Sequence, residues 1–99
     1  MRMDTPSGWV EWCELCRHTD SVAQFNELMS LFLTDDERAA IAGRYRIIQA
    51  LLSKSESQRQ IADSQNVSIA KITRGSNSLK HVSEDLNTFL TQQCKTITK

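Results

Sequence analysis

Residues 57–80 read SQRQIADSQNVSIAKITRGSNSLK and carry the signals for two short helices joined by a tight turn. Ser57 and Gln60 have the spacing of a capping box, which starts the first of these helices. Asn66 stands where the turn needs a left-handed backbone, a conformation that Asn tolerates better than most residues. Ser68 is then placed to cap the second helix. The segment therefore predicts a helix-turn-helix.

A helical hairpin with a tight turn also occurs as a plain core element, so spacing alone leaves a structural role open. Gln65 is polar at a position where such a motif often has an apolar residue. DNA binding is favoured by the start of the second helix, where Ser68, Ala70 and Lys71 follow one another closely. A helix that docks in the major groove needs a cap, small residues for close approach, and side chains that reach bases or phosphates.

The 99 residues are expected to form a single domain, residues 1–99, in which the helix-turn-helix spans residues 58–81. Only three Gly and one Pro interrupt the chain, so helix can follow helix throughout. Besides the two helices of the motif we expect four more, over residues 7–20, 22–32, 34–52 and the stretch that follows Ser83. The predicted fold class is all-α with six helices.

Apolar residues recur at helical spacing and predict which faces are buried. Both N-terminal helices have the composition of buried helices, and the helix over residues 34–52 is apolar on two sides, which suits the centre of a dimer. The other expected core residues are Trp9, Trp12, Cys13 and Cys16 in the first helix, Ile61, Ala62, Ile69, Ile72 and Leu79 in the motif, and Leu86, Phe89 and Leu90 in the last helix.

The charges cancel over the whole chain, with 12 basic and 12 acidic residues, but they are unevenly distributed. Residues 1–33 carry a net charge of −3, whereas residues 57–81 carry +3. Contact with phosphates needs only a local positive potential. The distribution predicts that DNA binding is confined to the surface of the helix-turn-helix.

Three cysteines in a chain without a secretory signal favour reduced thiols over a disulfide framework. Cys13 and Cys16 have C-x-x-C spacing, but no second ligand pair follows at the distance of a zinc site, so no metal is expected.

No stretch approaches the roughly 18 apolar residues of a membrane span, and we expect a cytoplasmic protein without a membrane partner. His18 and His81 form no catalytic constellation with the cysteines, so no enzyme is expected.

The run ITRGSNSLK at residues 72–80, with SQR at 57–59 and LFLT at 31–34, closely resembles the tryptophan repressor family of bacteria. The similarity extends over nearly the whole chain, from about Trp9 to Leu90. It implies an intertwined homodimer that represses transcription by binding operator DNA when complexed with L-tryptophan, its corepressor. The regulated genes would serve tryptophan biosynthesis or uptake. The alternative is a ligand-independent helix-turn-helix DNA-binding protein of the same fold.

By the same resemblance, L-tryptophan lies between the long helix and the second helix of the motif, with its indole between the side chains of Arg44 and Arg74. Guanidinium planes stack well on aromatic faces. Arg74 and Thr34 would meet the ligand carboxylate. The full set that the resemblance assigns to the ligand is Leu31, Leu33, Thr34, Arg44, Arg74, Gly75 and Ser78.

The ligand's amino group would be received by the carbonyls of Leu31 and Leu33 and by the hydroxyl of Ser78. The resemblance implies that the two leucines come from the other subunit. A complete pocket would therefore require the dimer.

Gly75 lies inside a predicted helix, where Gly costs roughly 1 kcal/mol relative to Ala. An indole lying against the backbone would explain the glycine, because a residue without Cβ allows a close approach. Tight packing against another helix is the alternative explanation. Thr34 is also justified as an N-cap, and Arg44 as a solvated or ion-paired residue. The joint presence of these residues favours a tryptophan pocket.

The residues expected to contact DNA come from both helices of the motif. The resemblance implies Gln58, Arg59, Ile69, Ala70, Thr73 and Lys80, and the requirements of helix docking add Ser68 and Lys71. Arg59 is suited to a bidentate contact with a guanine edge. The chain departs from the best-known family members at Ala62 and Lys71, which replace a lysine and a threonine, and at Asn66 and Ser68, which replace glycines. The operator sequence therefore does not follow from the resemblance.

Overall fold

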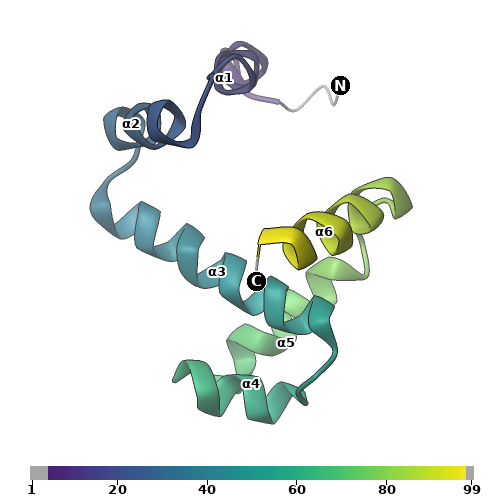
Figure 1. Ribbon diagram of the computed structural model, residues 1–99. Coiled ribbons are helices and arrows are strands. Elements are labelled where there is room, and N and C mark those ends of the chain that lie inside the picture. Colours follow the sequence, from purple (N-terminus) through teal and green to yellow (C-terminus); the bar gives the residue numbers. More distant parts are fainter. Residues whose placement is uncertain (1–4, 98–99) are drawn as a thin grey trace. The chain divides into compact units, whose positions relative to one another are not determined.

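The computed structural model describes residues 5–97 (Figure 1), a part of the chain that contains six α-helices and no strand. The helices are α1 (Trp9–Arg17), α2 (Val22–Phe32), α3 (Asp35–Ser53), α4 (Gln58–Gln65), α5 (Ile69–Leu79) and α6 (Glu84–Ile97). The predicted all-α fold class is confirmed. Arg2 and Asp4, which contribute to the charge of residues 1–33, lie outside the described residues.

The helix boundaries follow the local start and stop signals. Helix α1 begins later than its predicted range because Gly8, directly before it, has a left-handed backbone with φ 87°, and it ends earlier, at Arg17. The α2 N-cap is Ser21, whose hydroxyl accepts a hydrogen bond from the Gln24 amide at 3.1 Å. Near the end of α1 the Arg17 guanidinium donates to the Glu14 carboxylate at 3.0 Å, which lowers the pKa of that exposed carboxyl.

The contacts within the chain divide it into two compact units, of which the first ends at Ala39 and the second begins at Ala40. The core of the second unit consists of Ile47 from α3, Ile61 and Ala62 from α4, and Ile72 from α5. Ile61 and Ile72 have no exposed surface. Ala50, Leu51 and Val67 extend this core as partly buried neighbours.

One residue of the motif contradicts its predicted burial. Ile69 is 49% exposed, whereas Ile72, one turn further along α5, is fully buried. The prediction that Ile69 is a core residue was wrong. Helical spacing predicts which face of a helix is buried, but it does not predict how far along the helix the core extends. Leu79 is half-buried at the other end of α5.

The first unit has no buried residue in α1 or α2. Its aromatic rings contact one another: Trp9 stacks on Trp12 with 5.3 Å between ring centroids, and Trp12 meets the edge of Phe32 at 6.3 Å. Trp9 nevertheless remains 50% exposed, and Cys13 is exposed as well. The prediction that these helices are buried was wrong for a single chain, because two short helices offer too few neighbours to cover their own apolar faces.

Helix α6 also leaves apolar side chains uncovered. Leu86 and Phe89 are exposed, against their predicted place in the core, while Leu90 is half-buried and Cys94 is buried.

None of the helices in the described part of the chain combines the length and the apolar character that crossing a membrane requires. Residues 5–97 also contain no group of three His, Cys, Asp or Glu side chains placed to hold a metal ion.

Candidate functional site

The turn between α4 and α5 has the local geometry that its sequence predicts. The Ser57 hydroxyl accepts from the Gln60 amide at 3.2 Å, and the Gln60 side chain accepts from the Ser57 amide at 2.7 Å, which completes the capping box. Asn66 follows α4 with φ 54° and ψ 49°, the left-handed conformation expected there. The Ser68 hydroxyl accepts from the Lys71 amide at 3.3 Å and caps α5.

A side-chain hydrogen bond joins the two helices of the motif on their outer side. The Thr73 hydroxyl, in the second turn of α5, donates to the Gln58 side-chain oxygen at 3.4 Å. Both residues are exposed, and both belong to the predicted DNA-contacting set. The contact therefore places the N-terminal end of α4 beside the exposed face of α5.

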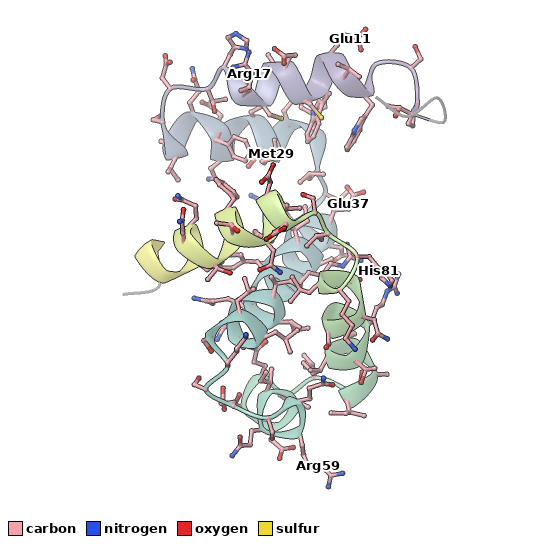
Figure 2. The ribbon with its side chains drawn as sticks, turned by 90° about the vertical axis from the view of Figure 1, so that its right-hand side faces the viewer. Glu11, Arg17, Met29, Glu37, Arg59 and His81 are labelled. Carbon is pink, nitrogen blue, oxygen red and sulfur yellow. The ribbon has the colours of Figure 1, made fainter. Side chains whose placement is uncertain are left out.

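The surface of the motif exposes every residue expected to contact DNA. Figure 2 shows the Arg59 side chain pointing away from the ribbon at the outer side of α4. The exposed predicted residues are Gln58, Arg59, Ser68, Ile69, Ala70, Lys71, Thr73 and Lys80. The exposure of Ile69, unexpected for a core residue, agrees with its other predicted role as a DNA contact.

Besides the shared core of Ile47, Ile61, Ala62 and Ile72, two further contacts join the motif to α3. The Gln65 side-chain amide, at the end of α4, donates to the Arg46 backbone carbonyl at 3.0 Å. Gly75 faces α3 so closely that a Cβ there would lie 3.0 Å from Cγ2 of Ile47 and 3.4 Å from Cδ1 of Leu51. The polar character of Gln65 thus has a structural explanation that the sequence did not provide.

The close approach at Gly75 is the packing alternative that the sequence left open. Ile47 and Leu51 occupy the space beside the glycine, so helix packing alone is sufficient to require it. A ligand is not needed to explain Gly75. Its assignment to a tryptophan pocket stays a prediction.

Arg44 and Arg74 are both exposed, and neither side chain has a hydrogen bond or ion pair with the described residues. Arg44 lies one turn before Ile47 on α3, and Arg74 directly precedes Gly75 on α5. Since residues three apart share a helix face, Arg44 lies next to the place where Gly75 packs on α3. Ser78 is exposed one turn after Arg74.

The other three predicted ligand residues belong to the first compact unit. Thr34 forms a capping box with Glu37: its amide donates to the Glu37 carboxylate at 2.8 Å, and its hydroxyl accepts from the Glu37 amide at 3.1 Å. Leu31 is 77% exposed, and Leu33 is half-buried at the end of α2. The capping role of Thr34 is therefore confirmed, and its role toward a ligand stays a prediction.

A hollow of about 1060 Å³ lies within the second unit, between the C-terminal half of α3, the end of α5 and α6. The described residues that line it include the cations Arg46, Lys54 and Lys80 and no carboxylate. None of the predicted ligand residues lines this hollow. Arg46 and Lys54 add positive charge from outside residues 57–81, the segment in which the charge distribution predicts the DNA-binding surface.

Comparison with known proteins places these features in a family. Residues 7–94 match the family model described as Trp repressor protein. The Trp operon repressor homolog of Chlamydia trachomatis serovar D is 42% identical over 93 residues, which cover 94% of this chain and 99% of that protein. The homolog of Chlamydia caviae is 44% identical over 84 residues, 85% of this chain and 83% of that protein. The homolog of Vibrio cholerae is 41% identical over 86 residues, 87% of this chain and 84% of that protein.

Proposed function

Because this chain belongs to the Trp repressor family of transcription regulators, we propose that it binds operator DNA as a homodimer when complexed with L-tryptophan. The genes it represses would be those of tryptophan biosynthesis or uptake. One observation carries the proposal: the helix-turn-helix exposes all eight residues expected to contact DNA. Action in the cytoplasm stays a prediction.

The capped N-termini of α4 and α5 support a DNA-binding role. Free amides at a helix N-terminus attract phosphate oxygens, and Arg59 and Lys71 place cations in the first turn of each helix. Ala70, beside Lys71, is small enough for α5 to approach base edges closely. We expect Lys71 to affect which sequence is bound, because it lies on the exposed first turn of α5.

The two arginines support a site for an aromatic ligand. The guanidinium groups of Arg44 and Arg74 are exposed and are not engaged with any described side chain, so both are available to stack on an indole. On α5, Arg74 lies between Thr73, one of the predicted DNA contacts, and Gly75, the residue that packs on α3. A ligand that binds Arg74 would thus affect the position of α5.

Exposed apolar side chains support the homodimer. α1, α2, α3 and α6 all expose large apolar residues: Trp9, Val10, Leu15, Val22, Phe25, Leu31, Phe32, Ile41, Tyr45, Leu86 and Phe89. Large apolar side chains that a single chain leaves uncovered on one element after another often mark a protein–protein interaction site. A second copy of the chain offers the same unpartnered faces and so suits a symmetric interface.

One observation favours ligand-independent DNA binding as a second candidate. Ile47 and Leu51 already fill the space at Gly75, and Gln65 already holds α4 to α3. A motif fixed in this way has less need of a ligand to place it. The two candidates differ in a single measurable quantity, the effect of L-tryptophan on DNA affinity.

That effect is measured by fluorescence anisotropy on a duplex that the wild-type protein selects from a random-sequence pool. We expect 1 mM L-tryptophan to tighten binding between about fivefold and 150-fold, the range of typical allosteric couplings. L-Phenylalanine at the same concentration is the control. Equal affinity with and without L-tryptophan would support the ligand-independent candidate, and failure to select any duplex would refute DNA binding itself.

Two arginine variants, one in α5 and one in α4, distinguish the contribution of the ligand site from that of the DNA surface. Arg74→Ala should abolish the response to L-tryptophan, because one face of the indole loses its guanidinium partner. Arg59→Ala should weaken DNA binding and leave tryptophan affinity unchanged, because Arg59 points to solvent (Figure 2). Calorimetry measures the tryptophan affinity of each variant, and undiminished affinity in Arg74→Ala would contradict the proposed site.

A further inference from the structure

Gln65 is a polar side chain whose role neither DNA binding nor ligand binding accounts for. It is half-buried at the end of α4, and its amide group donates to the Arg46 carbonyl on α3 at 3.0 Å. The Arg46 carbonyl lies inside α3, which continues to Ser53, so that it also serves the helix's own ladder. The hydrogen bond from Gln65 is thus an added, directional link between two helices.

The two links to α3 are placed at opposite ends of the region that would face DNA. Gln65 precedes Ser68, the N-cap of α5, by three residues, whereas Gly75 lies in the second half of α5. The contact at Gly75 is apolar and involves Ile47 and Leu51. This contact and the core around Ile72 hold α5 on α3 through apolar packing, which is not directional, so the hydrogen bond from Gln65 adds the directional component.

We infer that Gln65 is a positioning residue for DNA recognition: its hydrogen bond to Arg46 fixes the angle at which the helix-turn-helix stands on α3. The inference rests on the proposed function as a DNA-binding protein. The link acts at the end of the motif where Ser68, Ala70 and Lys71 are exposed. A change at Gln65 therefore alters recognition without removing any group that would contact DNA.

The test replaces the amide by groups of similar length. Gln65→Met keeps the length of the side chain and removes the donor. Gln65→Glu keeps the shape, and its ionised carboxylate repels the Arg46 carbonyl instead of donating to it. Gln93→Glu, at an exposed position of α6, is the control for added charge.

At pH 7.5, with L-tryptophan present, we expect Gln65→Met and Gln65→Glu to bind the selected duplex about tenfold more weakly, the order of the net contribution of one hydrogen bond. Affinity for poly(dI-dC), which depends on charge rather than on the angle of the motif, should fall less than twofold in Gln65→Met. The temperature of unfolding of Gln65→Met should change little, because packing of the apolar side chain at this half-buried site offsets the lost hydrogen bond.

A pH series separates positioning from packing. At pH 5 the carboxyl of Gln65→Glu becomes protonated in part and donates again, so its affinity relative to wild type should recover, while that of Gln65→Met should not. Both variants binding like wild type would overturn the inference, as would a loss that follows the temperature of unfolding and ignores pH. A wild-type protein that selects no duplex would instead refute the proposed function.

Discussion

The two compact units of the chain differ in how they bury their apolar side chains. In the unit that begins at Ala40, Ile61 and Ile72 are fully buried by neighbours from the same chain. In the unit that ends at Ala39, α1 and α2 contain two Trp and two Phe but no buried residue. The helix-turn-helix therefore completes a core together with α3, whereas the N-terminal helices have the apolar residues for a core and lack the neighbours.

The largest expected effect is in the self-contained core. Ile72→Ala should lower the free energy of unfolding by about 2–5 kcal/mol, because it removes a fully buried side chain and leaves a cavity. Ile69→Ala, on the same helix but 49% exposed, should cost less than about 1 kcal/mol. Urea denaturation measures both variants, and similar losses would contradict the difference in burial.

The next effect concerns the unit that lacks neighbours. If a second copy covers α1 and α2, Phe32→Asp places a charge in the interface and should weaken the dimer about 100-fold, or ~2.7 kcal/mol. Asn26→Asp adds the same charge to an exposed polar position of α2 and should have little effect. Sedimentation equilibrium gives the two dissociation constants, and a dimer unaffected by Phe32→Asp would place the interface elsewhere.

A smaller effect tests the packing between α5 and α3. Gly75→Ala introduces a Cβ 3.0 Å from Cγ2 of Ile47, and we expect a net loss of about 1 kcal/mol after the helix propensity of Ala is taken into account. Ile47→Leu removes that methyl group and should relieve part of the loss in the double variant. Additive losses in a double-mutant cycle measured by urea denaturation would show that the two residues do not contact each other.

The last effect, no larger than that at Gly75, lies in the turn. Asn66 has φ 54°, so Asn66→Ala should cost about 1 kcal/mol of unfolding free energy, because Ala lacks the tolerance of Asn for this conformation. Asn66→Gly should be neutral or slightly stabilising, since Gly adopts positive φ without strain. Thermal denaturation of the two variants checks this prediction, which fails if Ala and Gly behave alike.

Local signals in the sequence predicted most of the fold. Several predicted features depend only on neighbouring residues, and each is confirmed: the capping box at Ser57, the N-caps at Thr34 and Ser68, and the left-handed backbone of Asn66. Burial was predicted less well, because it depends on which neighbours exist. Phe89 has the spacing of a core residue and is exposed in the single chain.

The candidate site divides in the same way. The exposure of Arg59 and Lys71 follows from their helix positions, which the sequence gives. Two contacts could not be predicted from local patterns, because they join segments 19 or more residues apart in the sequence. They are the hydrogen bond from Gln65 to Arg46 and the contact of Gly75 with Ile47. A glycine inside a helix indicates a close approach but does not identify the neighbour. The sequence therefore favoured the ligand explanation of Gly75 and left the packing explanation open.

The central claim is that two copies of the chain assemble on one duplex in response to L-tryptophan. Sedimentation velocity of the labelled selected duplex, with and without 1 mM L-tryptophan, tests it most directly. We expect a complex of two chains per duplex when L-tryptophan is present and mostly free duplex when it is absent. One chain per duplex, or the same complex under both conditions, would contradict it.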